Sequence, residues 1–426
     1  MTESENLSDE ANLSNKLWLK NDAIARLLVM LGRDGEEARV VGGAVRNALM
    51  GLPVNEIDVA TTAEPNQVMH RAEAAGFKAI PTGVEHGTVT VVIDGRPFEV
   101  TTLRTDVETY GRKAKVMFGR DWQQDAERRD FTINALSASA DGRVYDYVGG
   151  LADISARKVR FIGDPEKRIA EDYLRILRFF RFHAHYGSGA PDPAGLLACI
   201  RARSGIDALS RERVRAEMLK LSVGPHPAPT LAVMAECGIL GTVLGGVAYL
   251  ASFENVVKAE AAIGLEADAA RRLGALGVWV MEDAERLSQR LRLSNAEVEQ
   301  LLKIEYWWRV APASGEHAAR TLLYLLGPAS FIDRVVVAWS RSAAGAADEA
   351  WRELATLPQR WTAPRFPLKA VDLINRGVPK GPLLGAALRV AEQAWIDADF
   401  TSDAAAIGVI ADSAAQAAQS QGLSSL

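Results

Sequence analysis

Two acidic residues stand one residue apart in the N-terminal stretch VVGGAVRNALMGLPVNEIDVAT. On a β-strand, residues i and i+2 point to the same side, so Glu56 and Asp58 would share one face while Ile57 and Val59 turn toward a core. Two carboxylates on one face repel each other unless a cation lies between them, and Mg²⁺ prefers oxygen ligands of this kind. A pair of exposed strand acids is the alternative when the pattern is taken alone.

A third acid, Glu99, lies on a second expected strand, in the sequence PFEVTT. Its neighbours Phe98 and Val100 would face the opposite way. Three acids that converge from two strands would hold one or two metal ions. Such a site can activate a hydroxyl group and stabilise a pyrophosphate leaving group.

A glycine pair precedes these acids in the chain. Gly42 and Gly43 free backbone N–H groups at the start of a helix expected from Ala44 to Met50, and a helix start of this kind attracts phosphate. Arg46 lies one turn into that helix. Together with the acids, these residues predict a site for a triphosphate and a metal ion. It is not a Walker A loop, because no GKS or GKT sequence follows. An ordinary strand-to-helix turn is the alternative for the glycines alone.

The segment EDYLRILRFFRF carries a second polar pattern. Asp172 and Arg175 are three residues apart, so they would share one face of a helix expected from Arg168 to Ala184, and Arg178 and Arg181 extend the stripe. A carboxylate beside a guanidinium matches the edges of cytosine and adenine, whereas uracil and guanine place a carbonyl where the amino group should be. The pair would accept C and A without a nucleic-acid template. A solvated intrahelical salt bridge is the alternative, and the phenylalanines beside the arginines count against it.

The composition is that of a globular protein with several domains. The chain has 426 residues, of which 48% are hydrophobic and 24% charged, and this length suggests two to four domains. No stretch has the pattern of a signal peptide or the roughly 18 apolar residues of a membrane span. The net charge is −5, yet Arg157 to Phe182 holds eight basic and four acidic residues, a basic zone inside an acidic protein. Cys199 and Cys237 are expected to be buried thiols in a reducing cytoplasm.

The expected elements place strands around the acids and helices after them. The segments ARVV, EIDVAT, GTVTVVID and RPFEVTTL are expected strands, and Asp94-Gly95 joins the last two as a hairpin. A helix is expected from Leu17 to Leu31. After about Gly150 the pattern changes to helices, one of them from Arg211 to Leu221. The expected fold class is therefore α+β.

These motifs together resemble those of the class II CCA-adding enzyme and poly(A) polymerase family of nucleotidyltransferases. The matching stretches, in order, are GGAVRNALMGLPVNEID, FEVTTLR, RRDFTINAL, GGLADISARKVRFIGDPEKRIAEDYLRILRFFRF and LSRERVRAEMLKL, and GPLLGAALRVAEQAW is similar to the tail helices of bacterial members. The strong part covers roughly Val40 to Leu221. The resemblance implies an N-terminal mixed α/β nucleotidyltransferase head, whose sheet contains antiparallel strands, followed by helical parts. The implied division is a disordered N-terminus 1–16, a head 17–147, a neck with base-recognition helices 148–225, a body 226–345 and an RNA-binding tail 346–426.

The resemblance also implies roles for particular side chains. Glu56 and Asp58 would bind the catalytic metal ions, taken as Mg²⁺, with Glu99 assisting. The nucleotide-binding residues would be Gly43 and Arg46 at the triphosphate, Arg129 at the nucleotide, Asp130 at the ribose 2′-hydroxyl, Asp172 and Arg175 at the base, and Arg178 and Arg181 in the rest of the pocket. The implied reaction adds C, C and A to the 3′ end of tRNA from CTP and ATP, releasing pyrophosphate, in the cytoplasm and with no role for a membrane.

Three positions depart from the usual residues of the family. Glu56 and Asn47 stand where Asp is frequent, and Ser137 stands where Tyr is common after INAL. Glutamate is one methylene longer than aspartate, so Glu56 must fold back to keep its oxygen near a metal ion. If all three changes weakened the site, the chain would be a catalytically impaired RNA-binding homologue.

The subtype within the family is a separate question, with CC-adding, A-adding and poly(A)-adding enzymes as alternatives to full CCA addition. The basic signature RRFxLxHV of bacterial poly(A) polymerases is not found after the neck. The loop between the third-acid strand and RRDFT is long and contains Arg112, Lys113 and Lys115, which favours full CCA addition; a flexible surface insertion is the alternative. No His-Asp pattern of a phosphohydrolase domain is found, so no phosphatase activity is expected. The sequence leaves the oligomeric state open.

Overall fold

The computed structural model describes residues 12–16, 19, 21–110 and 113–423, without the side chains of 105–116 and 421–423. It divides into two compact units, the first comprising Met1–Ala248 and Arg286–Leu293 and the second Tyr249–Glu285 and Ser294–Leu426. The first unit therefore extends beyond the predicted end of the neck at residue 225. Within the described residues, no helix combines the length and apolar character needed to cross a membrane.

The first unit is built on a mixed sheet of seven strands in the order β3-β4-β5-β2-β1-β8-β9. All neighbouring strands are antiparallel except β2 and β5, which run parallel. The expected hairpin joins β4 and β5, and both of its turn residues, Asp94 and Gly95, have positive φ (51° and 76°), as a two-residue turn requires. The strands are β1 (Ala38–Val41), β2 (Asp58–Thr61), β3 (Lys78–Gly83), β4 (Thr88–Ile93), β5 (Arg96–Thr102), β8 (Ser137–Ala138) and β9 (Val144–Tyr145).

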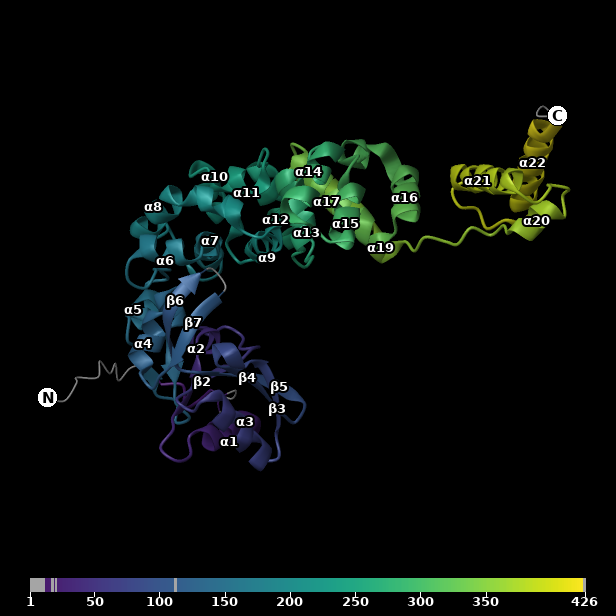
Figure 1. The fold of residues 1–426 in the computed structure, drawn as a ribbon. Coiled ribbons are helices and arrows are strands. Elements are labelled where there is room, and N and C mark those ends of the chain that lie inside the picture. Colours follow the sequence, from purple (N-terminus) through teal and green to yellow (C-terminus); the bar gives the residue numbers. More distant parts are fainter. Residues whose placement is uncertain (1–11, 17–18, 20, 111–112, 424–426) are drawn as a thin grey trace. The chain divides into compact units, whose positions relative to one another are not determined.

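One face of this sheet is covered by α1 (Asp22–Leu31) and α3 (Pro65–Ala74), which lie side by side in Figure 1. Alternate residues of β4 are fully buried against them, as the strand period requires. Leu13 belongs to the same core, with 2% of its surface exposed, and its N–H donates to the carbonyl of Gly142 at 2.8 Å. The predicted disorder of residues 1–16 is therefore wrong at Leu13, because a buried leucine anchors that segment; residues 1–11 lie outside the described part.

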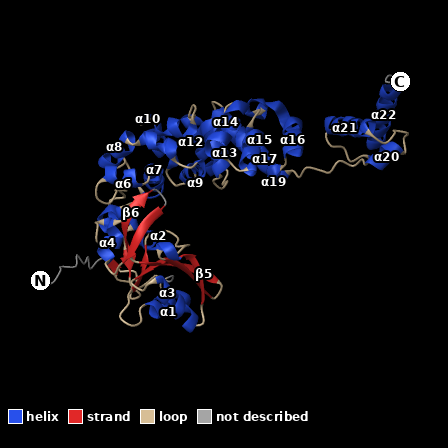
Figure 2. Cartoon of the chain, viewed as in Figure 1, coloured by secondary structure: helices blue, strands red, loops and turns tan. Residues whose placement is uncertain are grey.

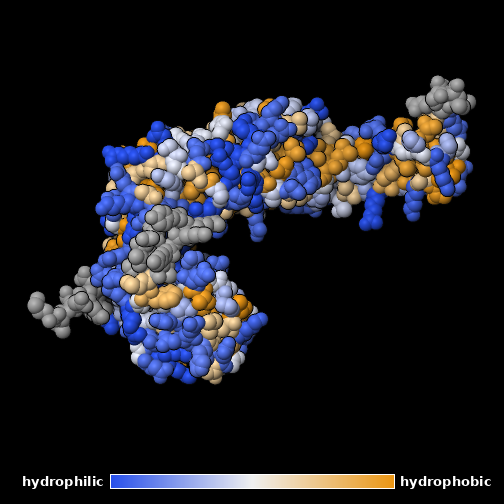
Figure 3. All heavy atoms as spheres, in the orientation of Figure 1, coloured by the Kyte–Doolittle hydropathy of each residue, from blue (hydrophilic) through white to orange (hydrophobic). Residues whose placement is uncertain are grey.

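The predicted long loop before RRDFT forms a separate two-stranded ribbon of β6 (Arg104–Tyr110) and β7 (Lys113–Phe118). Arg112 lies outside the described residues, and so do the side chains of Lys113 and Lys115. On the face that Figure 3 shows, hydrophilic residues cover most of the head, with hydrophobic residues between them in small groups.

Helices make up most of the rest of the first unit (Figure 2). The segment expected to be a single helix from Arg168 to Ala184 is instead two helices that meet at Asp172 and Tyr173. The helices in this part are α2 (Gly43–Leu49), α4 (Trp122–Glu127), α5 (Gly150–Ser155), α6 (Pro165–Glu171), α7 (Leu174–Tyr186), α8 (Pro193–Arg201), α9 (Arg211–Ser222), α10 (Pro227–Glu236) and α11 (Ile239–Leu244), with short 3₁₀ turns at Val84–His86, Thr132–Asn134 and Arg203–Ala208.

The described residues of the second unit form helices and the loops between them, with no strand. Buried charges join three of its helices: Glu260 accepts from Arg271 and Arg272 at 2.8 Å each, and Arg271 also donates to Asp333 at 2.9 Å. The helices are α12 (Leu250–Ala262), α13 (Ala269–Gly277), α15 (Asn295–Ile304), α16 (Gly315–Leu326), α17 (Pro328–Arg341), α18 (Glu349–Ala355), α19 (Leu357–Arg360), α20 (Ala370–Ile374), α21 (Pro382–Asp397) and α22 (Ala404–Leu423), with 3₁₀ turns at Trp307–Arg309 and Pro312–Ser314; α14 (Met281–Leu291) has residues in both units.

Candidate active site

The three predicted acids lie together where β2 begins. Asp58 is the first residue of β2 and pairs with Glu99 of β5 in parallel register, so the two side chains are neighbours across the strands. Glu56 lines the same cleft as Asp58 and Glu99, a space of about 610 Å³. All three residues are exposed. Their carboxylate oxygens are therefore open to a ligand from solvent.

Glu56 precedes β2 rather than lying in it, which corrects the expected strand EIDVAT. The neighbouring strand β1 ends at Val41, opposite Asp58, because the chain turns there at Gly42. On the other side, the parallel register places Glu56 opposite Pro97, which has no N–H to donate to a sheet. With no partner on either side, residues 56 and 57 stay outside the ladder, and Glu56 reaches the cleft from a loop.

Charge repulsion among the acids shapes the electrostatics of the cleft. Loss of part of its water shell raises the pKa of Asp58, the nearby Glu99 and Glu56 carboxylates raise it further, and the Arg129 guanidinium lowers it. Carboxylates crowded in this way fit a divalent cation with oxygen ligands. Within the part of the chain that the structure describes, no three Asp, Glu, His or Cys side chains are yet close enough to surround one ion. The carboxylates would therefore have to turn toward one another to hold it.

The glycine turn brings Arg129 close to the start of α2. Gly42 has a φ of 69°, a conformation that residues with a Cβ rarely adopt, and a Cβ there would lie 3.3 Å from Nη1 of Arg129. The same guanidinium donates to Asp125 at 3.2 and 3.3 Å and to the carbonyl of Asn134 at 3.3 Å. Gly43 follows as the first residue of α2. Arg129 thus lies beside the glycine turn and acts electrostatically on Asp58.

Arg46, predicted to contact a triphosphate, is buried, with 6% of its surface exposed. It donates to the side-chain oxygens of Asn47 and Asn134 and, at 2.7 Å, to the hydroxyl of Tyr186, whose ring centroid lies 3.9 Å from its Cζ. Burial lowers the pKa of this guanidinium. Asn47, which replaces a frequent Asp, serves here as a neutral acceptor. Arg46 thus links α2 to the end of α7, and its contact with a phosphate stays a prediction.

Asp130 and Arg178 join the RRDFT motif to helix α7. Arg178 Nε donates to Oδ2 of Asp130 at 2.7 Å, while Oδ1 accepts from the N–H of Phe131 at 2.9 Å and the amide of Asn134 at 3.2 Å. Burial acts to raise the pKa of Asp130, but the Arg178 charge and these hydrogen bonds outweigh it, so the pKa lies below its usual range. Two residues that the sequence placed in one nucleotide pocket are therefore in direct contact.

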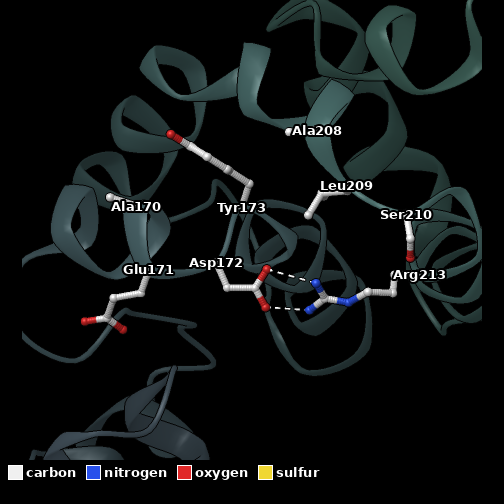
Figure 4. Close-up of a pocket in the computed structure, with 8 residues that line it drawn as sticks. All are labelled: Ala170, Glu171, Asp172, Tyr173, Ala208, Leu209, Ser210 and Arg213. Atoms are coloured by element: carbon white, nitrogen blue, oxygen red, sulfur yellow. Dashed lines mark hydrogen bonds and ion pairs between the residues drawn. The ribbon is translucent and has the colours of Figure 1, made fainter. Parts of the chain in front are cut away.

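Asp172 does not share a helix face with Arg175, contrary to the prediction. Asp172 is extended (φ −157°, ψ 107°) between α6 and α7, and its Oδ1 accepts from the N–H of Leu174 at 3.1 Å. A side chain that bonds to the backbone in this way competes with helix formation, which explains the break. Its carboxylate instead holds Arg213 of α9 through two hydrogen bonds, at 2.5 and 3.2 Å (Figure 4).

The other predicted arginines of α7 are also held by acids. Arg175 pairs with Glu171 and donates to the carbonyl of Arg168 at 2.8 Å. Arg181 donates to Glu217 of α9 at 2.5 Å. Two residues of α9 were not among the predicted site residues: Arg213, which donates to Asp172, and Glu217, which accepts from Arg181. Their spacing of four residues within the expected neck helix was the available signal for a shared face.

The acids and Asp172 line different cavities, and the charged residues Arg129, Asp130 and Arg178 act electrostatically on one or the other of them or on each other. Asp172 lines a cavity of about 370 Å³ together with Tyr173 and Arg213. Arg129 acts electrostatically on Asp58, and the next residue, Asp130, bonds to Arg178. Burial opposes the charge of Arg178, but Asp130, Glu217 and Asp172 raise its pKa. Both cavities thus belong to the first unit, and the RRDFT motif supplies a charged residue that acts on Asp58 and another that pairs with Arg178.

Comparison with known families gives two matches. The family model described as "Poly A polymerase head domain" matches residues 38–160, which contain the three acids and the RRDFT motif. The model described as "Probable RNA and SrmB- binding site of polymerase A" matches residues 191–250, which contain α9.

Similar proteins of known name cover most of the chain. The "CCA tRNA nucleotidyltransferase 1, mitochondrial" of Danio rerio is 33% identical over 88% of this chain and 87% of its own length. The "CCA-adding enzyme" of Limosilactobacillus fermentum is 30% identical over 88% of this chain and 93% of its own. The crystal structure of the Bacillus stearothermophilus CCA-adding enzyme in complex with CTP is 30% identical, with a TM-score of 0.72 over 88% of this chain and 93% of that chain. The chain belongs to the class II CCA-adding enzyme family of nucleotidyltransferases.

Proposed function

We propose that this protein adds C, C and A to the 3′ end of tRNA without a nucleic-acid template, using CTP and ATP and releasing pyrophosphate at each step. The observation that carries the proposal is that one unit holds the three exposed carboxylates, the Asp130–Arg178 ion pair and the Asp172 carboxylate. This gives one unit both a place for phosphoryl chemistry and a group able to read a base. We further propose that this activity takes place in the cytoplasm.

The acid cleft is the proposed place of bond formation. Glu56, Asp58 and Glu99 would hold a divalent metal ion, which we take to be Mg²⁺. When bound, this ion would offset the charge of the triphosphate and favour loss of the proton from the tRNA 3′-hydroxyl. In-line attack of that oxygen on the α-phosphate forms the new phosphodiester bond, and the bond to pyrophosphate breaks. The exposed carboxylates fit this role because solvent and substrate reach them directly.

The groups around the cleft hold the nucleotide in place. Gly43 and Arg46 contact the triphosphate in this proposal, and Arg129 reaches the nucleotide. Asp130 accepts from the ribose 2′-hydroxyl in this proposal, and one of its present donors must then give way, because Phe131, Asn134 and Arg178 already supply two hydrogen bonds to each of its oxygens. Groups already fixed by hydrogen bonds need little rearrangement during the reaction, which is how such sites lower a barrier.

Base selection falls to Asp172 and the arginines around it. Asp172 accepts from the amino group of cytosine or adenine, and Arg175 donates to the neighbouring ring nitrogen. Arg178 and Arg181 complete the pocket, each fixed by an acid. In the structure Asp172 binds Arg213, so that bond must be shared or released when a base arrives. Arg213 therefore joins the residues that set the position of the selecting carboxylate.

A product ladder tests the proposal. The protein receives tRNA transcripts that lack one, two or three terminal nucleotides, with CTP and ATP supplied separately and together. We expect CTP alone to add two residues to the shortest transcript, and ATP alone to add one residue only to the transcript that ends in CC. An arrest after CC with both nucleotides would show a CC-adding enzyme, and a run of A would show a poly(A) polymerase. Bound tRNA with no incorporation would show the impaired homologue.

A further inference from the structure

A continuous cluster of aromatic and arginine side chains lies in the second unit, far in sequence from the acids. Five rings form an unbroken series of contacts, with centroid distances of 4.7 to 6.0 Å. Three guanidinium groups lie over these rings, with Cζ 4.6 to 6.0 Å from a ring centroid at each contact. We name it the aromatic–arginine cluster; its members are Tyr249, Trp279, Tyr306, Trp307, Trp308, Arg309, Arg334 and Arg341.

Three rings of this cluster are turned to solvent. Trp308 is 49% exposed, Tyr306 38% and Trp279 37%. Tyr306 has a φ of 63°, a left-handed conformation that costs a bulky residue about 1–2 kcal/mol. Tyr306 lies between the end of α15 and the 3₁₀ turn Trp307–Arg309. The backbone is therefore strained at the residue next to these rings. Packing inside the protein explains the position of the Trp307 ring, but it does not explain why the rings of Trp279, Tyr306 and Trp308 are exposed.

The arginines of the cluster are distinguished by what they contact. Within the described residues, none of the three forms an ion pair with a carboxylate. Arg334 donates to the carbonyl of Lys303 at 2.6 Å, and Arg341 to Ser252 and to carbonyls at the end of α13. Burial lowers the pKa of Arg341 to about 10. Elsewhere in the unit, arginines bind acids, as at Arg271, Arg272, Arg320 and Arg376. The three arginines thus form no direct ion pair with a described residue, while the Glu305 and Asp283 carboxylates act on Arg334 and Arg341 only from a distance.

Exposed flat rings beside arginines that form no ion pair with any described residue match the chemistry of single-stranded RNA, in which unpaired bases stack on aromatic side chains and phosphates meet arginines. We propose that Trp279, Tyr306 and Trp308 form a platform on which an unpaired base of the tRNA substrate stacks, with Arg309 and Arg334 facing the adjacent phosphates. This inference rests on the proposed function for its ligand. It assigns a second tRNA contact to the enzyme, one that holds the substrate without taking part in the reaction.

Binding measurements on matched variants test the platform. Trp308→Ala removes the most exposed ring, Trp308→Phe keeps a smaller one, and Leu325→Ala removes an exposed apolar side chain outside the cluster as the control. Stacking of one base predicts a loss of full-length tRNA affinity of about 5- to 160-fold for Trp308→Ala, with Trp308→Phe close to wild type. The KM for CTP and the kcat at saturating tRNA should not change. Equal tRNA affinity of Trp308→Ala and Leu325→Ala would overturn the proposal.

A measurement on the unaltered protein keeps the proposal testable if a variant misfolds. Ultraviolet crosslinking of wild type to tRNA, followed by peptide mapping, should attach RNA to residues 305–309; crosslinks confined to the first unit would overturn the proposal. Sedimentation of wild type and Trp308→Ala tests a second copy of the chain as the occupant, and a dimer lost in the variant with unchanged tRNA affinity would also overturn it. If wild type adds no nucleotide at all, the proposed function fails; if it adds CCA normally while Trp308→Ala binds tRNA normally, only the platform fails.

Discussion

The ion pair of Asp130 and Arg178 gives the sharpest test of how the head motif is joined to α7. The substitution Arg178→Met removes the guanidinium and keeps most of the apolar stem. Asp130 would then retain only the N–H of Phe131 and the amide of Asn134 as donors. The side chain of Asp130 is 11% exposed, so its charge would be left poorly solvated.

The size of the effect follows from this burial. Removing one partner of a buried ion pair costs about 3–5 kcal/mol. Arg178 is itself 31% exposed, so water screens part of the interaction. We therefore expect Arg178→Met to lower the free energy of unfolding by about 2–3 kcal/mol. For a unit of this size, that loss lowers the Tm by about 4–12 °C. The Asp130→Asn variant should lose a comparable amount, and the double variant less than the sum of the two.

The dependence on pH carries a definite sign. The pKa of Asp130 is depressed in the folded wild type, so its stabilisation is present above the unfolded value near 3.9 and is lost as the pH falls through the lower folded value. Without Arg178, burial raises that pKa and the stabilisation disappears. Thermal unfolding is followed by circular dichroism at pH 7 and below pH 4. The difference in Tm between wild type and Arg178→Met should be smaller at the lower pH. A Tm difference under 1 °C at pH 7, or a Tm difference that does not change with pH, would refute this explanation.

Three further predictions concern the cleft and the second unit. Asp58→Asn should lower kcat for incorporation by at least about 100-fold and leave the Kd for tRNA within two-fold, as measured by single-turnover assay and gel shift. Gly42→Ala should slow incorporation about 10-fold because it both strains a positive φ and crowds Arg129, whereas Gly51→Ala, at a φ of 71° with open space around it, should affect stability only. Glu260→Gln should lower the free energy of unfolding of the second unit by about 3–5 kcal/mol, measured by denaturant titration, because two buried arginines lose a charged partner.

The parts of the site that follow from local pattern could be predicted from the sequence. Phe98 and Val100 are buried while Glu99 is exposed, as the strand period indicates, and the Asp94-Gly95 hairpin lies where its turn residues place it. The pairing of Asp58 with Glu99 also agrees with the expected convergence of acids from two strands. Here a period of two residues and a turn of known type leave few arrangements open.

The parts that depend on distant packing could not be predicted. The choice of Arg213 rather than Arg175 as the partner of Asp172 joins residues 41 apart in sequence, and no local spacing encodes it. The position of Glu56 outside β2 depends on where β1 ends and on Pro97 in the neighbouring strand. In both cases the deciding contact comes from an element elsewhere in the chain.

One measurement tests most directly the central claim, that the acids and Asp172 serve a single nucleotidyl-transfer site. Single-turnover incorporation of CTP, UTP and GTP on tRNA lacking its terminal CCA, and of ATP, UTP and GTP on tRNA that ends in CC, is compared for wild type, Asp172→Ala and Asp58→Asn. The account predicts strong preference for CTP and ATP in wild type, loss of that preference with some incorporation of UTP and GTP in Asp172→Ala, and no incorporation of any nucleotide in Asp58→Asn. An Asp172→Ala protein that keeps the wild-type rate and the wild-type preference would contradict it.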